Sequence, residues 1–378
     1  VVLDVEGRAV EVAPETLAGH LALEVGESGD LAPVVDGEAL HGALAGPLAG
    51  VEQPAVDAAF ETDGEAVRVV PSSPGRTLPA AALAGAVESV VLEPAPRRAP
   101  VTLVVTEPER TTAEAEALGV VERVSTFTSQ HPCCQPRVRN IHRIADMLDG
   151  HLVLPGEEFS LNRVVGERTR ANGFVPAPQI SEGRFTDGVG GGISQFVTTM
   201  FNAVFFAGLQ DVQHTPHSYY ISRYPPGRES TVSYPEPDFR FRNDSEAAVL
   251  VDTAYTERSI TVSFYGTKRY DIEAVAGPRR DVTSYRTVYD PDGDCEPMSG
   301  GNGFDITVTR VFRQGGVEVR REDFETTYKP QPRVICSPRP APRPSPSPSP
   351  RPSGSPTPAA SPQAEVEPEP AVGDEPQG

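Results

Sequence analysis

The stretch GVGGGISQFVTTMFNAVFFAGL, residues 188–209, decides the fold of the surrounding region. Its three successive glycines allow backbone conformations that are closed to other residues, and they allow close approach to a ligand. The mostly apolar residues that follow predict a helix that ends near Gly208. The segments on either side of this helix then indicate the class of the domain.

Helical and strand patterns flank this stretch within residues 123–270. Residues 138–150 predict a helix with one apolar face that Gly150 ends, and residues 151–169 follow as strand and turn. Strands are then predicted at 230–234, 238–243, 247–255 and 259–266. Helices followed by a run of antiparallel strands indicate an α+β domain. Beyond it, within an extension at 271–336, residues 304–328 predict a hairpin that turns at two glycines.

Residues 1–122 predict a second, separate α+β domain. Apolar residues at helical spacing occupy 13–24, 36–50 and 78–93, and strands are expected at 31–36 and 99–107. Residues 57–71 carry Asp-Gly between two alternating runs, which predicts a hairpin. This part of the chain groups no His, Cys and carboxylate together, so we expect binding or scaffolding from it.

Composition limits the classes of function. The chain has 378 residues and a net charge of -20, which argues against a nucleic-acid-binding protein because phosphate is bound by clustered Lys and Arg. No apolar run reaches the roughly 20 residues of a membrane-spanning helix. Residues 337–378 are rich in Pro and Ser and predict a disordered tail, which is either a linker or an inert end.

Four cysteines bear on the compartment. Cys133 and Cys134 are adjacent, whereas Cys295 and Cys336 are separate, and four cysteines allow three complete pairings. From their spacing we predict bonds between Cys295 and Cys336 and between Cys133 and Cys134. Disulfides indicate an exported, oxidising location. Since the chain begins at Val1, we expect a targeting or anchoring segment upstream of it.

Candidate catalytic residues follow the three glycines. Ser194 stands where the helix begins, so it either caps the helix or acts as a nucleophile. His217 and Glu229 come later in the order that a Ser/His/acid triad requires, although a histidine beside tyrosines can equally be a packing residue. His131 precedes the cysteine pair, but no second cluster of ligands accompanies it, so we predict neither a metal nor a cofactor.

The region from about residue 127 to 266 resembles the VanW family. The resemblance rests on RVRNIHRIADMLDGHLVLPGEEFSLNRVVGERT, GGGISQFVTTMFNAVFFAGL, HSYYISRYPPGRESTV and DFRFRND, in this order. Residues 1–122 resemble the peptidoglycan-binding domain that precedes it in YoaR-like proteins, through VDAAFETDGEAVRVVPSSPGRTL and the following helix. The resemblance implies an extracytoplasmic protein of the cell envelope, secreted or held at the membrane by a segment absent from this chain.

The family motif usually reads G-G-G-x-C-Q, and a later one G-x-D-A-T-V, so Ser194 replaces the cysteine and Glu229 the aspartate. Serine is a poorer nucleophile unless a base activates it, which favours binding over catalysis. We therefore predict a protein that binds peptidoglycan or its precursors, as an accessory factor in glycopeptide-antibiotic response or wall maintenance. The alternative is a serine-type amidase or transpeptidase acting on stem peptides. The predicted groove contains Gly190, Gly191, Gly192, Gln195, Asn162, Arg168, His217 and Arg228.

Overall fold

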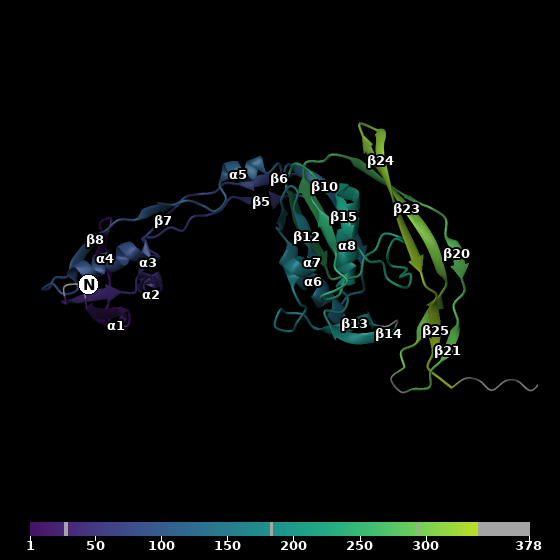
Figure 1. Cartoon of the computed structure of the whole chain (residues 1–378), viewed down its shortest axis with the longest axis horizontal. Coiled ribbons are helices and arrows are strands. Elements are labelled where there is room, and N and C mark those ends of the chain that lie inside the picture. The colour runs from purple at the N-terminus through teal and green to yellow at the C-terminus, as the bar shows by residue number, and fades with distance from the viewer. Residues whose placement is uncertain (26–28, 182–183, 293–294, 339–378) are drawn as a thin grey trace, which may run out of the picture. The chain divides into compact units, whose positions relative to one another are not determined.

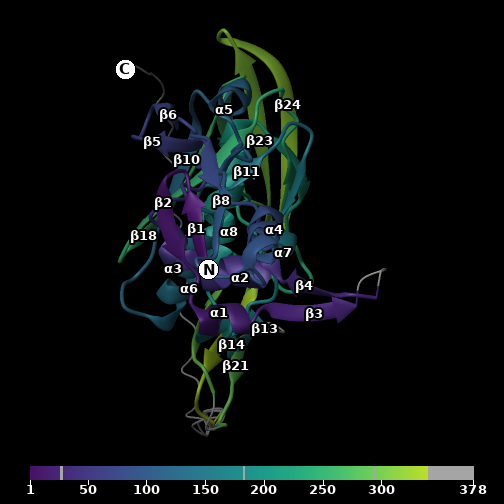
Figure 2. The same cartoon turned by 90° about the vertical axis from the view of Figure 1, so that its left-hand side faces the viewer.

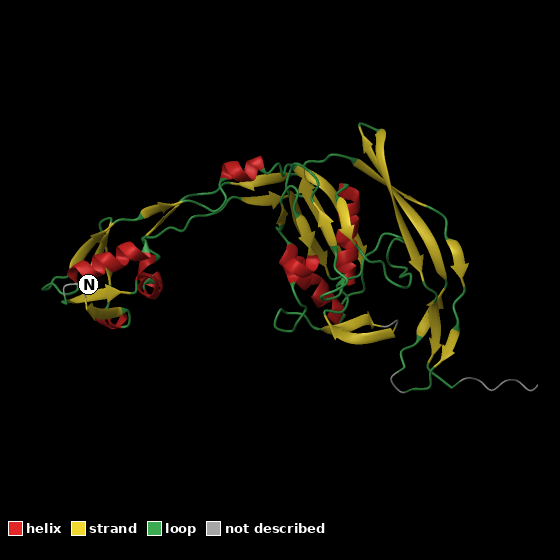
Figure 3. Ribbon diagram, viewed as in Figure 1, coloured by secondary structure: helices red, strands yellow, loops and turns green. Residues whose placement is uncertain are grey.

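The computed structural model describes residues 1–25, 29–181, 184–292 and 295–338, and the fold is α+β (Figures 1 and 3). The predicted disordered tail lies outside the described residues from residue 339 onward. Within the described ranges, no helix is long and apolar enough to cross a membrane.

The N-terminal region builds a small sheet covered by helices. Strand β1 pairs antiparallel with β2 and parallel with β8, and the apolar sides of α2 and α4 bury Leu40, Leu83 and Val87 against it. Asp36 caps α2 by accepting a hydrogen bond from the Ala39 amide. The elements are β1 Val2–Val5, β2 Arg8–Glu11, α1 Pro14–Ala18, β3 Leu21–Val25, β4 Leu31–Val35, α2 Gly37–Ala43, α3 Ala45–Leu48, β5 Ala59–Thr62, β6 Val67–Val70, β7 Gly75–Thr77, α4 Ala80–Val90, β8 Arg98–Val101, β9 Val104–Thr106 and α5 Thr112–Ala117.

The helical prediction for residues 13–24 is wrong in its second half. Only α1 is helical, and β3 follows and pairs with β4, so that Leu21 lies opposite Val35 and Val25 opposite Leu31. Figure 2 shows these two strands as a hairpin beside α1. Leu21, Leu23 and Val25 alternate with small or polar residues, and this period of two fits a strand better than a helix.

The hairpin predicted at 57–71 is confirmed as β5 and β6, and it contacts strands from the second half of the chain. The Thr62 hydroxyl donates to Asp252 over 2.7 Å, and the Tyr265 hydroxyl donates to the carbonyl of Gly64, also over 2.7 Å. The division of the chain at residue 122 therefore stays a prediction, because residues on both sides of it share these contacts.

The central region is an antiparallel sheet packed on a buried helix. The sheet has the strand order β10-β18-β17-β11, and α8 lies against β10 and β18 (Figure 1). Every residue of α8 except Ser194 and Phe206 is buried, and the helix ends at Gly208 with a φ of +67°. The elements are β10 Glu122–Gln130, α6 Pro136–Leu148, β11 Leu152–Val153, β12 Glu158–Ser160, α7 Leu161–Val165, β13 Pro176–Ser181, β14 Arg184–Val189, α8 Ser194–Ala207, β15 Gln210–Gln213, β16 Arg240–Arg242, β17 Val249–Thr256 and β18 Ser259–Gly266.

The strand predicted at 230–234 is absent from this described part of the chain. The amide of Ser230 donates to the Thr198 hydroxyl on α8, and the amide of Thr231 donates to the carbonyl of Thr215. The amide of Ser233 donates to the carbonyl of Pro237, four residues later. The backbone of this segment is thus occupied by a helix side chain and by turns, so that no regular ladder forms.

The C-terminal extension is built from strands, and the two longest, β23 and β24, form the hairpin predicted at 304–328 (Figure 3). A disulfide joins Cys295 and Cys336 with a Cα–Cα distance of 5.6 Å, as the spacing predicted. Arg310 of β23 is fully buried and donates to the carbonyl of Leu209 over 3.0 Å, which fixes the extension against the end of α8. The elements are β19 Asp271–Ala276, β20 Arg280–Thr283, β21 Thr287–Tyr289, β22 Met298–Gly301, β23 Gly303–Gln314, β24 Val317–Tyr328 and β25 Gln331–Ile335.

Candidate functional site

The three glycines before α8 bring the chain close to two arginine side chains. Gly190 and Gly192 have φ angles of +87° and +91°, in the left-handed region that glycine adopts readily. A Cβ at Gly190 would lie 2.8 Å from the Cβ of Arg168, and a Cβ at Gly192 would lie 2.5 Å from the Cβ of Arg137. A Cβ at Gly191 would lie 2.1 Å from a backbone carbonyl oxygen of β13. All three positions therefore require glycine, because protein groups occupy the space around them.

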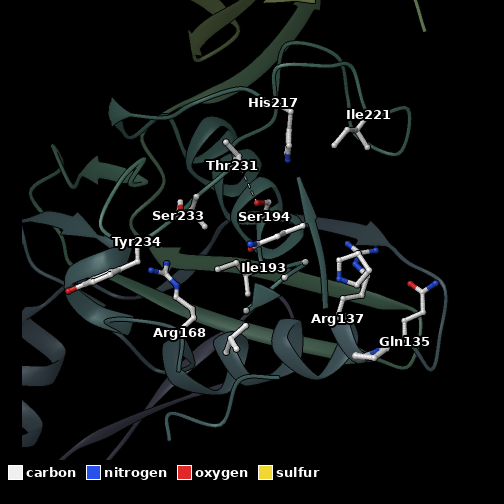
Figure 4. Close-up of a pocket in the computed structure, with 18 of the residues that line it drawn as sticks. Gln135, Arg137, Arg168, Ile193, Ser194, His217, Ile221, Thr231, Ser233 and Tyr234 are labelled. Carbon is white, nitrogen blue, oxygen red and sulfur yellow. Dashed lines mark hydrogen bonds between the residues drawn. The ribbon is translucent and has the colours of Figure 1, made fainter. Parts of the chain in front are cut away.

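A cavity of about 1100 Å³ opens at this turn (Figure 4). Its walls come from the glycine turn, the start of α6, the residues before α8 and the segments 217–224 and 231–237. Among the described residues, Arg137, Arg168 and Arg223 line it together with one carboxylate, Glu167, and with His217. Because the cationic groups outnumber the carboxylate, the cavity favours an anionic ligand.

Ser194 is the first residue of α8 and lines the cavity. The N-cap is Ile193, and the Ser194 hydroxyl forms its hydrogen bond with the Thr231 hydroxyl over 3.0 Å. The capping role considered for Ser194 is therefore wrong. Its side chain is directed toward the cavity wall formed by Thr231 (Figure 4).

His217 and Glu229 form a buried pair, and His217 lines the cavity. The Nδ1 atom of His217 lies 2.8 Å from a carboxylate oxygen of Glu229, and the two side chains are 8% and 0% exposed. A carboxylate accepts hydrogen bonds, so Nδ1 of His217 donates to Glu229 and Nε2 is not engaged by this partner. The His217 ring also stacks on Tyr224, with a centroid distance of 5.5 Å. This arrangement gives a histidine that is fixed in one tautomer and faces the cavity.

The predicted triad is thus assembled only in part. The link between His217 and Glu229 is present, and Ser194 and His217 line the same cavity (Figure 4). Among the described residues, however, the hydrogen bond of the Ser194 hydroxyl goes to Thr231, and His217 makes none with it. A histidine base activates a serine through a hydrogen bond to its hydroxyl, and in enzymes without bound substrate this hydrogen bond is often long or poorly aligned.

Arg168, a predicted ligand-binding residue, is buried and has hydrogen-bond donors at the cavity that no described residue pairs with. It is 7% exposed, its Nη1 donates to the Asn162 side chain, and its Nε and Nη2 have no hydrogen-bond partner among the described residues. Burial lowers the pKa of Arg168 to about 10, although the charges of Asp238 and Tyr234 act in the opposite direction. Asn162 itself donates to two backbone carbonyls in the segment 233–235 and does not line the cavity. It therefore positions Arg168.

Gln195 also has a supporting role. It is fully buried, donates to the Ser129 hydroxyl over 3.0 Å and accepts a hydrogen bond from Arg137 over 2.8 Å. Arg137 lines the cavity, although the apolar pattern of the sequence places the start of the helix at residue 138 and so does not predict this residue. Pro136 stands in the first turn of α6, a position that proline favours, and this signal could have placed Arg137 at the start of the helix.

Arg228 was predicted to bind the ligand, but it lies away from the cavity. Its guanidinium packs over the rings of Phe205 and Phe206, at 5.5 and 5.0 Å from their centroids. It does not line the cavity. The apolar face of α8 thus takes up this side chain, whereas Arg223, five residues earlier, lines the cavity instead.

The predicted bond between Cys133 and Cys134 is wrong, because both thiols are free. Consecutive Cα atoms lie about 3.8 Å apart, whereas disulfides usually join Cα atoms about 4.4 to 6.8 Å apart. No group of three or more His, Cys, Asp or Glu residues that could hold a metal ion occurs in the part of the chain that the structure describes.

Two parts of the chain match known protein families. Residues 136–265 match the family described as "VanW like protein", and residues 3–100 match the family described as "Putative peptidoglycan binding domain". The chain thus contains a domain that matches the VanW family. The two matches together indicate a cell-wall related protein.

Two curated relatives show how far the likeness extends. The chain is 44% identical over 142 residues to the uncharacterized protein YoaR of Bacillus subtilis, covering 38% of this chain and 46% of that protein. It is 24% identical over 140 residues to the vancomycin B-type resistance protein VanW of Enterococcus faecalis, covering 35% and 50%. The chain thus spans about half the length of these curated relatives. No solved structure matches it significantly.

The charged and catalytic candidates of the cavity all belong to the VanW domain, since Arg137, Arg168, Ser194, His217 and Glu229 fall within the matched residues 136–265. Beside them lies one residue from the extension. The Tyr328 hydroxyl accepts a hydrogen bond from the Gly227 amide over 2.8 Å. Burial raises the pKa of Tyr328, and the charge of Glu229 raises it further, which indicates that the two groups are neighbours.

Proposed function

We propose that the VanW domain binds the stem peptide of peptidoglycan in the cavity at the start of α8. The observation that supports this most directly is the buried guanidinium of Arg168, which lines the cavity and whose Nε and Nη2 atoms have no hydrogen-bond partner among the described residues. A buried donor without a partner costs about 1 to 3 kcal/mol, and a ligand carboxylate would remove that cost. Arg is also suited to planar, bidentate carboxylates.

Titration calorimetry with a soluble stem tetrapeptide tests this proposal. Arg168→Gln is expected to weaken binding at least tenfold, because it removes a charged hydrogen-bond donor from a buried site. Arg170→Gln is the matched control, since Arg170 is exposed two residues further along and does not line the cavity. Absence of binding by the unmodified chain, or equal losses in both variants, would contradict the proposal.

The biological setting belongs to the same proposal. We propose that the protein acts in the cell envelope, exported or anchored by a segment outside this chain, in wall maintenance or in the response to glycopeptide antibiotics. The matched peptidoglycan-binding family and the disulfide support this setting. Protease added to intact cells should digest the protein, whereas a cytoplasmic marker should survive. Protection of the protein to the same degree as the marker would refute export.

A serine-type amidase or transpeptidase remains the second candidate, and the fixed tautomer of His217 favours it. In this reaction the Ser194 hydroxyl would add to a peptide carbonyl and pass its proton to Nε2 of His217. The peptide C–N bond would then break as His217 gives that proton to the leaving amine, and water or an acceptor amine would release the acyl group from Ser194. Incubation of the protein and of Ser194→Ala with muropeptides, followed by mass spectrometry, tests the candidate. New products should form with the unmodified chain only. Identical products from both, or none from either, would exclude this serine-based reaction.

A further inference from the structure

We infer that the cavity recognises two carboxylates of one stem peptide, bound on opposite sides of Ser194. This inference rests on the proposed function and names the chemical class of ligand. The cavity contains two separate cationic regions, one formed by Arg168 and one by Arg137 with Arg223. Figure 4 shows Arg168 and Arg137 on opposite sides of Ser194.

The first cationic region is held rigidly. The Nη1 atom of Arg168 donates to Asn162, whose amide group donates to the carbonyls of Ser233 and Pro235 over 2.8 Å each. The aliphatic stem of Arg168 packs against Gly190, where even a methyl group would clash. Both ends of the side chain are therefore fixed. Nε and Nη2 are left for a ligand.

The second cationic region has charge that the protein does not neutralise. Burial and the neighbouring charge of Arg223 lower the pKa of Arg137, which shows that two like charges lie near each other. Arg137 donates to the neutral Gln195, and neither arginine forms an ion pair within the described residues. An anionic group at this position would relieve their repulsion.

A single turn sets the spacing between the two regions. Arg168 packs on Gly190 and Arg137 packs on Gly192, and these glycines are two positions apart. The three-glycine turn, which ends two residues before Ser194, thus packs one arginine against its first glycine and the other against its last. Two carboxylates on one short peptide suit this arrangement, since a stem tetrapeptide L-Ala–γ-D-Glu–L-Lys–D-Ala carries one on its glutamate and one at its C-terminus. A neutral glycan offers no such pair of charges.

Four synthetic forms of this tetrapeptide test the inference: both carboxylates free, either one amidated, and both amidated. In titration calorimetry, each single amidation is expected to weaken binding to the unmodified chain about tenfold or more. Arg168→Gln should be insensitive to one amidation, and Arg137→Gln should be insensitive to the other. Arg139→Gln, an exposed change on the same helix and outside the cavity, should respond as the unmodified chain does.

The outcomes separate the inference from the proposed function. Equal binding of all four peptides would overturn the inference while leaving stem-peptide binding intact, and no binding of any peptide would overturn both. Loss of sensitivity to both amidations in one variant would also overturn the inference, because it would mean that one arginine serves both groups. If Arg137→Gln does not fold, Arg223→Gln is used in its place, because Arg223 is exposed and its replacement should leave the fold intact. The Arg223→Gln variant should be insensitive to the same amidation as is expected for Arg137→Gln.

Discussion

Gly191→Ala is expected to destabilise the VanW domain by displacing strand β13. The added Cβ would lie 2.1 Å from the carbonyl oxygen of Ala177, 2.6 Å from its carbon and 2.9 Å from the carbonyl oxygen of Pro178. Ordinary van der Waals contact begins at 3.4 Å, so the strand or the turn has to move by more than 1 Å. All three contacts are with backbone atoms, and no side-chain rotation relieves them.

The buried side chain of Asn140 raises the cost of such a movement. It donates to the carbonyls of Gly191 and Val175 over 2.9 Å each and accepts from the Val175 amide over 2.8 Å, which ties the turn to the residue before β13. Overpacking of this kind costs about 1 to 3 kcal/mol. We expect a loss in this range, together with weaker peptide binding, because Pro178 of β13 lines the cavity.

Urea unfolding followed by the near-ultraviolet circular dichroism of tyrosine measures this loss, since the chain has no tryptophan. Hydrogen exchange of peptides from α6 and α8 assigns the loss to the VanW domain. The control is Gly85→Ala in the middle of α4, where no atom lies within 4 Å of the added Cβ and where alanine should stabilise by roughly 0.5 to 1 kcal/mol. Gly191→Ala with an unchanged midpoint and unchanged exchange in α8 would refute the steric argument.

Three further predictions concern other parts of the chain. Cys336→Ser removes the disulfide to Cys295, which closes a loop of 41 residues. The free energy of unfolding of the extension should fall by roughly 4 kcal/mol, seen as a lower unfolding midpoint. A reductant should produce the same decrease in the unmodified chain. Burial raises the pKa of Asp252, so the folded state holds the carboxyl proton to a higher pH than the unfolded state does. The free energy of unfolding should therefore fall as pH rises from about 4 through the raised pKa. Asp252→Asn should remove this pH dependence, measured by urea unfolding at successive pH values. Tyr328→Phe leaves the buried amide of Gly227 without its acceptor and should cost about 1 to 3 kcal/mol, with faster exchange of that amide; unchanged exchange would contradict this.

Local patterns in the sequence were sufficient for much of the fold. The apolar run after the three glycines gave α8, the Asp-Gly and Gly-Gly pairs gave two hairpins, and the spacing of the separate cysteines gave the observed disulfide. These features depend on residues close in sequence, or on the few pairings that four cysteines allow. The error at 13–24 passed over a local alternation of period two that β3 and β4 use as a hairpin, whereas the error at 230–234 arose because hydrogen bonds to Thr198 and Thr215 occupy that backbone.

The candidate site divides along the same line. The sequence by itself determined that glycines precede α8, and that Arg168, His217 and Glu229 are candidate site residues. Only the tertiary structure decided that Arg137 and Arg223 line the cavity while Arg228 packs on phenylalanine rings. The physical reason is that the cavity walls come from segments tens of residues apart. Which arginine lines the cavity depends on how those segments pack around α8, and a local sequence pattern does not specify that packing.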